Sequence, residues 1–358
     1  THTEMDNNQV ATRSGRKNLV IGGNFSTNPW QRGTGSTTMA HDDLLADRFR
    51  HRQVGVGVVT HDKVADSPTV AEAGILSTDC LVIATTTVDT SLATNDQYAL
   101  YYKMEGHDFA QIAQRDFVVT FWHKHVKTGT HCVAFRNSGF DRSYVAEYTQ
   151  AVTNTWEKAT IKVTASPSAG TWNYGSSVGM QMTFCMATGT DGETTADAWN
   201  TGSFVATTSQ VNNMDSTSNV MRFALIQVEE GIEATDFERR TFGEELALCQ
   251  RYYEKTWNHG KDPGTATDTG RLIDRARTTT AVNHGVHWGF AVTKRTTPTV
   301  TVYSPQTGAS GNLEIAASDY PASSLNAGTS GTSMDTTSTV VAGDNNFVSA
   351  HVTVDAEL

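Results

Sequence analysis

The stretch FVVTFWHKHVKTGTHCVAFRN, residues 117–137, contains the clearest strand pattern in the chain. Side chains of an extended segment point alternately to its two sides, and from Phe117 to Trp122 both sides are mainly apolar. Such a strand is typical of the centre of a sheet that is covered on both faces. The turn KTGT follows and HCVAFRN returns as a partner strand, so this stretch predicts a β-hairpin.

Short apolar or alternating runs, separated by turn residues, extend from the segment NLVIGGNF to about residue 228. The strands predicted on this pattern are Val54–Thr60, Cys80–Thr87, Tyr98–Met104, Phe117–Val126, Val133–Arg136, Ser143–Thr149, Glu157–Val163, Val178–Cys185 and Met221–Val228. No helical periodicity interrupts them, and no repeat of fixed period indicates a β-helix or a propeller. We therefore expect an all-β fold in which these strands form a β-sandwich or barrel.

One segment departs from the β pattern: FERRTFGEELALCQRYYEKTW, residues 237–257. Thr241 and Glu244 have the spacing of a capping box, in which each side chain accepts a hydrogen bond from the other residue's backbone N–H. Apolar residues recur along it at helical spacing: Phe242, Leu246, Cys249, Tyr253 and Trp257. We predict a connecting α-helix over residues 241–258, with this stripe buried between two β modules or at a subunit interface.

The predicted helix divides the chain into two β regions. Residues 1–17 lack periodicity and are expected to be an N-terminal arm or linker, and residues 18–240 to form the larger sandwich. Residues 259–358 contain five further strand-like runs, enough for a smaller β-sandwich: AVNHGVHWGFAV, PTVTVYSP, LEIAA, STVVA and NFVSAHVTVDAEL. We interpret NAGTSGTSMDTTST, residues 326–339, as a mobile loop or as an arm laid across a neighbouring subunit.

Composition and charge exclude several classes of partner. The 358 residues carry a formal net charge of -11, and no cluster of Lys and Arg large enough for nucleic acid is present, since the patch RSGRK is short. No apolar run approaches the ~18 residues of a membrane span. The four cysteines form no C-x-x-C pair, so we expect buried free thiols and neither a metal knuckle nor a redox motif. No cofactor is predicted.

The histidines of HKHVKTGTH are the one constellation with metal-binding chemistry. His123 and His125 share a face of the predicted strand, and His131 lies across the turn. Three imidazoles can bind zinc or copper. No carboxylate partner lies nearby in the sequence, and alternating polar residues near the end of a strand are typical of a solvent face. We therefore predict a solvent face and no metal site.

Two patterns raise the question of catalysis. GSSVG, residues 175–179, matches the nucleophile pattern at Ser177, but that chemistry needs a strand before the serine and a helix after it, and here a loop precedes and a strand follows. Glycoside hydrolysis needs two converging carboxylates. Acidic residues do gather in two places: Asp191, Glu193 and Asp197, and Glu229, Glu230, Glu233, Asp236 and Glu238. Because acidic surface loops are common, we predict a chain that is not an enzyme.

Aromatic residues in polar loops are the candidate binding residues. TWNYG and DAWNTG each place a tryptophan beside an asparagine, and a third tryptophan lies in NPWQRG. A sugar ring packs its C–H face on such a ring while amides bond its hydroxyl groups. The residues predicted to bind glycan are Trp172, Asn173, Tyr174, Trp199, Asn200 and Trp30. The alternative for each tryptophan is a lid folded back on the end of the sandwich.

Several phrases occur in an order that resembles a module of bacteriophage virion proteins: NLVIGGNFSTNPWQRG, LADRF, FVVTFWHKHVKTGTHCVAFRNSGFDRSYVAEY, NTWEKATIKV, MRFALIQVEEGIEATDFERR and GEELALCQRYYEKTW. The resemblance covers roughly residues 18–257. The segment from FAVTKRTTPTVTVYSP to VDAEL is similar to a C-terminal module that often follows in the same tail-fibre and receptor-binding proteins.

The resemblance implies a jelly-roll sandwich similar to carbohydrate-binding modules. It also implies a protein displayed on the virion surface after assembly in the host cytoplasm, as a homotrimeric tail fibre, spike or other appendage that binds a host cell-surface glycan. The N-terminal arm would join it to other virion proteins. Relatives with a structural calcium would place Asn24 and Asp236 near it, although no Asp-rich loop is present here. Two alternatives stay open: a purely structural capsid or tail decoration protein, and a polysaccharide-degrading spike.

Overall fold

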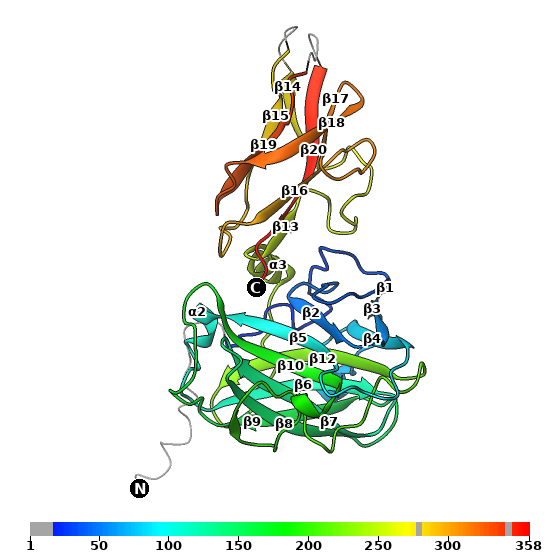
Figure 1. The fold of residues 1–358 in the computed structure, drawn as a ribbon, viewed down its shortest axis with the longest axis vertical. Coiled ribbons are helices and arrows are strands. Elements are labelled where there is room, and N and C mark those ends of the chain that lie inside the picture. Colours follow the sequence, from blue (N-terminus) through cyan, green and yellow to red (C-terminus); the bar gives the residue numbers. More distant parts are fainter. Residues whose placement is uncertain (1–16, 277–280, 341–345) are drawn as a thin grey trace.

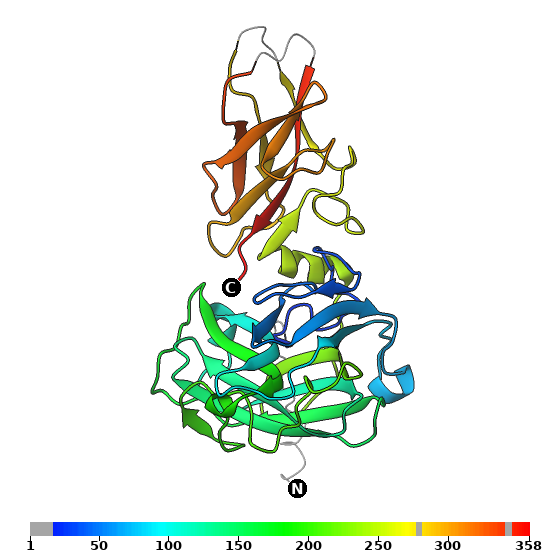
Figure 2. The same ribbon diagram turned by 45° about the vertical axis from the view of Figure 1, so that its right-hand side comes forward.

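The computed structural model describes residues 17–276, 281–340 and 346–358. These residues form two β modules stacked end to end, with one helix of more than a single turn at their junction (Figure 1). The same stacking is visible after a 45° rotation (Figure 2). The all-β prediction is therefore confirmed. The predicted arm, residues 1–17, lies outside the described residues except for Lys17.

The larger module is a sandwich of two antiparallel six-stranded sheets. The first sheet has the order β1 (Thr37–Thr38), β3 (Val58–Val64), β4 (Cys80–Thr87), β12 (Val220–Glu230), β6 (Phe117–His125) and β9 (Glu157–Val163). The second has the order β11 (Trp199–Thr201), β8 (Arg142–Gln150), β7 (Gly129–Asn137), β10 (Val178–Thr188), β5 (Gln97–Glu105) and β2 (Phe49–Val54). Short helical turns are α1 (Val70–Ala73), α2 (Gly106–Phe109) and η1 (Thr190–Gly192).

Successive strands cross between the two sheets, as in a jelly roll. The chain passes from β5 in the second sheet to β6 in the first, returns to the second for β7 and β8, and then crosses at β9, β10 and β12. The inward side chains of facing strands make one apolar core, in which Phe121 of β6 lies 5.0 Å from Phe184 of β10 between ring centroids. The β-hairpin predicted at residues 117–137 is wrong, because β6 pairs with β9 and β12 in the first sheet, whereas β7 pairs with β8 and β10 in the second.

One predicted strand, Val54–Thr60, is wrong. The structure has the end of β2 at Val54, a turn, and the start of β3 at Val58. The alternation of valine and glycine through this stretch imitates a strand, but Gly55 has a φ of 128° and a β-carbon on it would lie 2.0 Å from the hydroxyl oxygen of Tyr98. The glycine allows this turn to pack against the tyrosine.

The connecting helix α3 spans Phe242–Gln250, and its capping box of Thr241 and Glu244 is confirmed. Its predicted end at residue 258 is wrong, because the chain becomes extended and β13 (Tyr253–Lys255) pairs with the smaller module. The stripe is divided accordingly. Cys249 is buried in the joint, whereas Phe242 is 45% exposed. Tyr253 and Trp257 are buried, but they are not helical.

The smaller module is built around β20 (Asn346–Asp355) and has one apolar core. Strands β13 and β16 (Thr299–Tyr303) pair with the second half of β20, and β14 (Leu272–Ala276) and β17 (Asn312–Ile315) pair with the first half. The sheet continues from β17 through β18 (Ser318–Leu325) and β19 (Gly331–Thr336) to β15 (Gly285–Gly289). Part of the predicted run STVVA lies outside the described residues.

The loop or arm predicted for residues 326–339 is wrong, because it contains β19. This strand pairs with β15 and β18, and alternate residues Thr332, Met334 and Thr336 are buried in it. The sequence signal is weak because threonine and serine occupy positions that larger β-branched residues fill in most strands. Strands β14 and β18 were not predicted either.

A buried ionic cluster joins the two modules. Arg48 pairs with Glu357, and its guanidinium carbon lies 3.4 Å from the ring centroid of Tyr252. Arg32 lies 3.2 Å from Asp47 and 3.5 Å from Glu357. Burial by itself would lower the pKa of Arg48, but the Glu357 carboxylate, together with Tyr252 and other nearby groups, more than offsets this, and the pKa lies above its ordinary value. Because Glu357 follows β20, these pairs link the smaller module to the larger one.

All four cysteines are free and buried, as predicted. Burial raises the pKa of the Cys249 thiol well above its ordinary range, which is consistent with a packing role and not with a reactive one. No helix in the described part of the chain is long and apolar enough to cross a membrane.

Candidate ligand-binding groove

The outer face of the second sheet is covered over only part of its width. The segment after β11 lays Val205 and Ala206 on outward side chains of β7, β8 and β10, and this small apolar cluster also includes Cys132 and Cys185. Towards β5 and β2 the same face is open. A cavity of about 350 Å³ lies there, between the covering segment and the edge strand.

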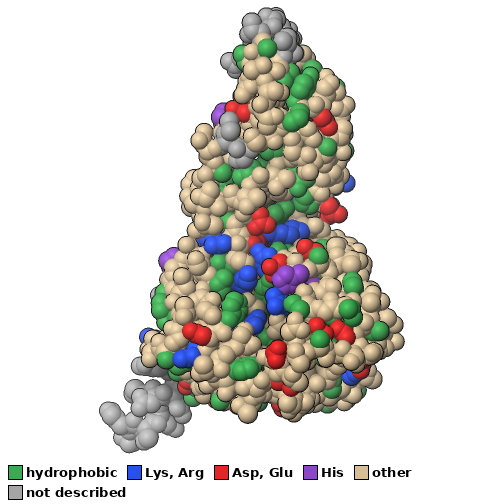
Figure 3. Space-filling view, viewed as in Figure 1, with side chains coloured by type: hydrophobic (Ala, Val, Ile, Leu, Met, Phe, Trp, Pro, Cys, Tyr) green, Lys and Arg blue, Asp and Glu red, His purple; other side chains and the backbone are tan. Residues whose placement is uncertain are grey.

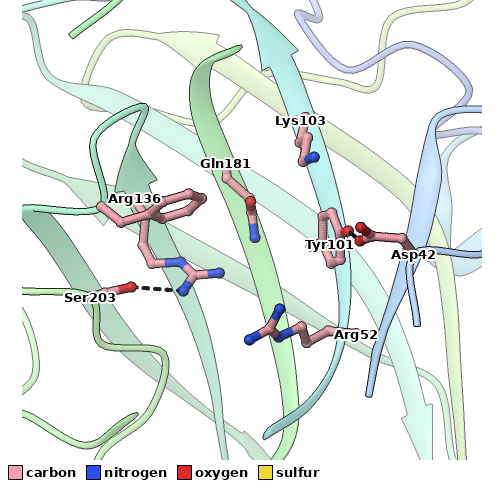
Figure 4. A pocket seen from close by; sticks show the side chains of 8 residues that line it. Asp42, Arg52, Tyr101, Lys103, Arg136, Gln181 and Ser203 are labelled. Atoms are coloured by element: carbon pink, nitrogen blue, oxygen red, sulfur yellow. Dashed lines mark hydrogen bonds between the residues drawn. The ribbon is translucent and has the colours of Figure 1, made fainter. Parts of the chain in front are cut away.

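Polar side chains from several strands line this groove (Figure 4). Strand alternation places them, because Tyr102 and Met104 of β5 point into the core and their neighbours Tyr101 and Lys103 point outward. The full lining is Asp42, Arg52, Tyr101, Lys103, Arg136, Phe140, Gln181 and Ser203. The groove therefore has three cationic side chains and one carboxylate, in a chain whose net charge is -11.

Arg136 of β7 is the most deeply placed cation of the groove. It is 7% exposed, and its Nη1 donates to the Ser203 hydroxyl at 3.0 Å. Its guanidinium carbon lies 4.9 Å from the ring centroid of Phe140, and its Nε has no hydrogen-bond partner among the described residues. Burial, followed by the charge of nearby Arg52, lowers the pKa of Arg136 to about 10. The side chain is still charged near neutral pH.

The other polar groups of the groove are held in place by their neighbours. Arg52 donates from Nε to Gln97 Oε1 at 2.9 Å. Asp42 accepts a hydrogen bond from the Tyr101 hydroxyl, which fixes the carboxylate at one end of the groove. Lys103 donates to the Leu358 carbonyl at 3.0 Å, and burial lowers its pKa.

Phe140 supplies an exposed aromatic ring beside these polar groups. Its side chain is 43% exposed, and its backbone has a φ of 54° in the turn between β7 and β8. A positive φ is rare for a bulky residue and marks local strain, which is often found where a side chain must be held in a particular place. Here it holds the ring against Arg136 at the rim of the groove.

The predicted glycan-binding residues lie elsewhere, and Trp30 requires a correction. It is 2% exposed, packs on Phe25 at 6.0 Å between ring centroids, and donates from Nε1 to the Phe25 carbonyl at 2.8 Å. A ring with no free face cannot support a sugar, so the prediction at Trp30 is wrong. The apolar segment that precedes it folds into the sandwich and carries the tryptophan with it.

The structure brings together the other predicted aromatic residues at one end of the sandwich. Trp172 stacks on Phe109 at 5.0 Å and meets Trp199 edge-on at 5.7 Å, while Tyr174 lies 6.0 Å from Phe109. Both tryptophans are half-buried against the core, and their Nε1 atoms donate to the backbone carbonyls of Ala169 and Thr164. This is the lid arrangement. A role in binding stays a prediction for these three side chains.

The side chains of both predicted asparagines form hydrogen bonds with backbone groups a few residues away in the chain. The Asn173 side-chain oxygen accepts from the Gly175 N–H at 2.8 Å, and the Asn200 amide donates to the carbonyls of Thr195 and Ala198. These bonds hold the local backbone: a loop at Asn173, and the segment just before strand β11, to which Asn200 belongs.

The predicted solvent face of histidines is wrong. His123, His125 and His131 are each at most 1% exposed, because the two on β6 continue the inward face begun by Phe117 and Phe121. Neighbouring rings lie 5.1 Å and 4.6 Å apart between centroids. Burial lowers the pKa of all three, to about 4 for His131. No group of three or more metal-ligating side chains is found in the part of the chain that the structure describes.

The serine and the acidic residues of the candidate catalytic patterns have local structural roles. Ser177 lies in a bend directly before β10, so no helix follows it, and the turn interpretation is confirmed. Glu229 is buried and accepts from the Thr235 N–H and hydroxyl, and Glu238 accepts from the backbone N–H groups of Lys17 and Asn18. These carboxylates tie the segment after β12 to the sandwich.

Comparisons with known proteins give partial similarities in fold. No protein-family model and no curated protein matches the sequence. A tailspike protein of bacteriophage CBA120, in its enzymatically active domain, matches with a TM-score of 0.31 and 12% identity, over 60% of this chain and 21% of that one. The matched region therefore spans about a fifth of the tailspike chain.

Carbohydrate-binding modules are also among the similar structures. The family 11 module of a cellulosomal cellulase from Clostridium thermocellum matches with a TM-score of 0.31 and 12% identity, over 56% of this chain and 98% of that one. A tandem CBM22 domain from Paenibacillus barcinonensis matches with a TM-score of 0.27 and 9% identity, over 91% and 92% of the two chains. The jelly-roll description rests on the strand order of this chain itself.

Proposed function

We propose that this chain is a non-catalytic glycan-binding protein, displayed on the surface of a phage virion, that attaches the particle to its host cell. One observation carries the binding function: an open groove on the second sheet combines an exposed ring at Phe140 with fixed donors and acceptors at Arg52, Arg136 and Gln181. Sugars are bound by this combination of an apolar surface with a few oriented polar groups.

The virion location rests on the resemblance of the sequence to phage appendage proteins. A homotrimer fits this proposal. Three sites of low affinity in one particle component would bind together to a cell surface that carries many copies of the glycan, and the combined affinity would be higher. In the same proposal the N-terminal arm joins the chain to other virion proteins.

A purely structural decoration protein is the second candidate, and an apolar surface favours it. A cavity of about 620 Å³ beside α3 includes Ala247, Leu248 and Val292 in its lining. Phe242, at the start of the same helix, is 45% exposed. A neighbouring virion protein would cover such a surface.

Phe140→Ala is expected to weaken glycan binding roughly tenfold, about 1.4 kcal/mol, because the sugar loses its ring contact. The measurement is a glycan array with neutral and acidic saccharides, followed by titration of the best ligand. Phe347→Ala is the matched control, since Phe347 is also an exposed phenylalanine beside an arginine, but in the smaller module.

Two further variants, Trp172→Ala and Trp199→Ala, separate the groove from the aromatic lid. If the two lid variants lose glycan binding and Phe140→Ala does not, the binding site lies at the lid and not in the groove. An array on which the wild-type protein binds nothing would overturn the glycan-binding proposal and favour the structural alternative.

A further inference from the structure

The groove contains an arginine whose charge is not matched by an acid. Arg136 is almost fully buried, yet within the described ranges it makes no ion pair and bonds only to the neutral Ser203. Burying a charge is costly unless an opposite charge compensates it. After burial, the largest effect on its pKa comes from a second cation, Arg52.

Three other arginines whose side chains are mostly buried are each paired with a carboxylate. Arg48 pairs with Glu357, and Arg32 lies 3.2 Å from Asp47. Arg240, with an 8% exposed side chain, lies 2.6 Å from Glu238. Arg136 therefore departs from the pattern of its own protein, and it does so inside an open cavity where a ligand can supply the missing anion.

The second arginine faces the same space. Figure 4 shows the guanidinium groups of Arg52 and Arg136 pointing toward one another across the strand that carries Gln181. The single carboxylate, Asp42, is bonded to Tyr101. In the space-filling view, Lys and Arg side chains gather in the middle of the molecule, near the junction of the modules (Figure 3).

We infer that the ligand of this groove is an acidic saccharide whose anionic group, a carboxylate or a sulfate ester, binds between Arg136 and Arg52. This inference rests on the proposed glycan-binding function and adds the charge of the sugar. A guanidinium donates two parallel hydrogen bonds to a carboxylate or a sulfate, and a hydrogen bond between charged groups is stronger than one between neutral groups. The Phe140 ring then contacts the sugar body, and Gln181 is placed to bond a hydroxyl.

The test compares matched pairs of saccharides on the purified full chain. The pairs are galacturonan oligomers with their carboxyl-reduced galactan counterparts, and sialyllactose with lactose; heparin-type disaccharides supply the sulfated arm. We expect the acidic member of at least one pair to bind at least tenfold more tightly than its neutral counterpart, or the sulfated disaccharide to bind at least tenfold more tightly than the neutral sugars. Its affinity should fall as salt is raised, because salt screens charge pairs.

Arg136→Gln and Arg52→Gln identify the residues. Each is expected to remove most of the preference for the acidic sugar while weak binding of the neutral one remains. Arg275→Gln, at an exposed arginine of the smaller module, is the control and should change neither. Arg136→Gln should also leave the melting temperature unchanged or raised, because it removes an unmatched buried charge.

The results distinguish this inference from the function on which it rests. Equal binding of neutral and acidic sugars, or a lower melting temperature of Arg136→Gln with an unchanged preference, would overturn the inference and leave glycan binding intact. If no saccharide binds at all, the proposed function fails and the inference fails with it.

Discussion

Glu357→Gln is expected to lower the free energy of unfolding by about 3–5 kcal/mol, the typical result of removing one partner of a buried ion pair. The carboxylate is 2% exposed and pairs with Arg48, whose side chain is 1% exposed. Without it, no other acid forms an ion pair with Arg48 among the described residues. Arg32 also loses a carboxylate, but it keeps Asp47 and Asp355.

Urea denaturation of the full chain measures this change. The double variant Arg48→Met with Glu357→Gln is expected to recover much of the loss, because it removes the unmatched charge and leaves an apolar chain beside Tyr252. The control is Glu233→Gln, which breaks an exposed pair with Lys162 and should change stability by less than about 1 kcal/mol. If Glu357→Gln also changed the free energy of unfolding by less than about 1 kcal/mol, the Arg48–Glu357 pair would not hold the modules together.

Acidification is expected to destabilise the protein by several kcal/mol between about pH 6.5 and pH 4. Burial lowers the pKa of His131 from 6.5 to about 4, and burial, with His41, lowers that of His51 to about 4. The unfolded chain binds protons in this range while the folded chain does not. The stabilisation is present above pH 6.5 and is lost as the pH falls to 4, by roughly 3 kcal/mol for His131 alone. Burial raises the pKa of Asp47 to about 6, and this carboxyl acts in the opposite direction.

His125→Phe isolates the contribution of the buried cluster. The His125 pKa lies well below its ordinary value because of burial and the neighbouring histidines, and its Nδ1 has no partner among the described residues. A phenylalanine would keep the ring contacts with Tyr148 and Phe223 but could not take up a proton. We expect a shallower fall of stability with acid, measured by urea denaturation at a series of pH values.

The control for this experiment is His107→Gln, at an exposed histidine outside the buried cluster. Identical profiles for His125→Phe and the wild type would contradict the assignment of acid sensitivity to this cluster.

Local patterns predicted much of the larger module. Cys80–Thr87 and Glu157–Val163 were predicted with the bounds that the structure has, because their apolar runs and flanking turns are read directly from neighbouring residues. The predictions fail where the secondary structure of a segment depends on pairing with residues distant in the chain. Tyr253–Lys255 continues a helical pattern in the sequence, but its backbone hydrogen bonds go to β20, about a hundred residues later. Strand β19 has little apolar signal and is held by the strands on either side of it.

The groove was not predicted from the sequence. A loop tryptophan beside an asparagine matches the pattern of a sugar site, because the ring and the amide are adjacent in the chain. Trp30 nevertheless folds into the core. Arg52, Arg136 and Gln181 come from three different strands, and each is unremarkable in its own segment. The available signal was a charged residue at an outward position of a mostly apolar strand, such as Arg136 in HCVAFRN.

Residue types and their periodicity were thus sufficient for the all-β class, for most strands of the larger module and for the capped start of α3, because each depends on side chains a few positions apart. Only the folded chain decided which side chains share a face, a cavity or an ion pair. The clearest case is the histidines of HKHVKTGTH, since the same alternation describes either face of a strand. The choice between core and solvent was made by the second sheet, which packs on the side that Phe117 and Phe121 occupy.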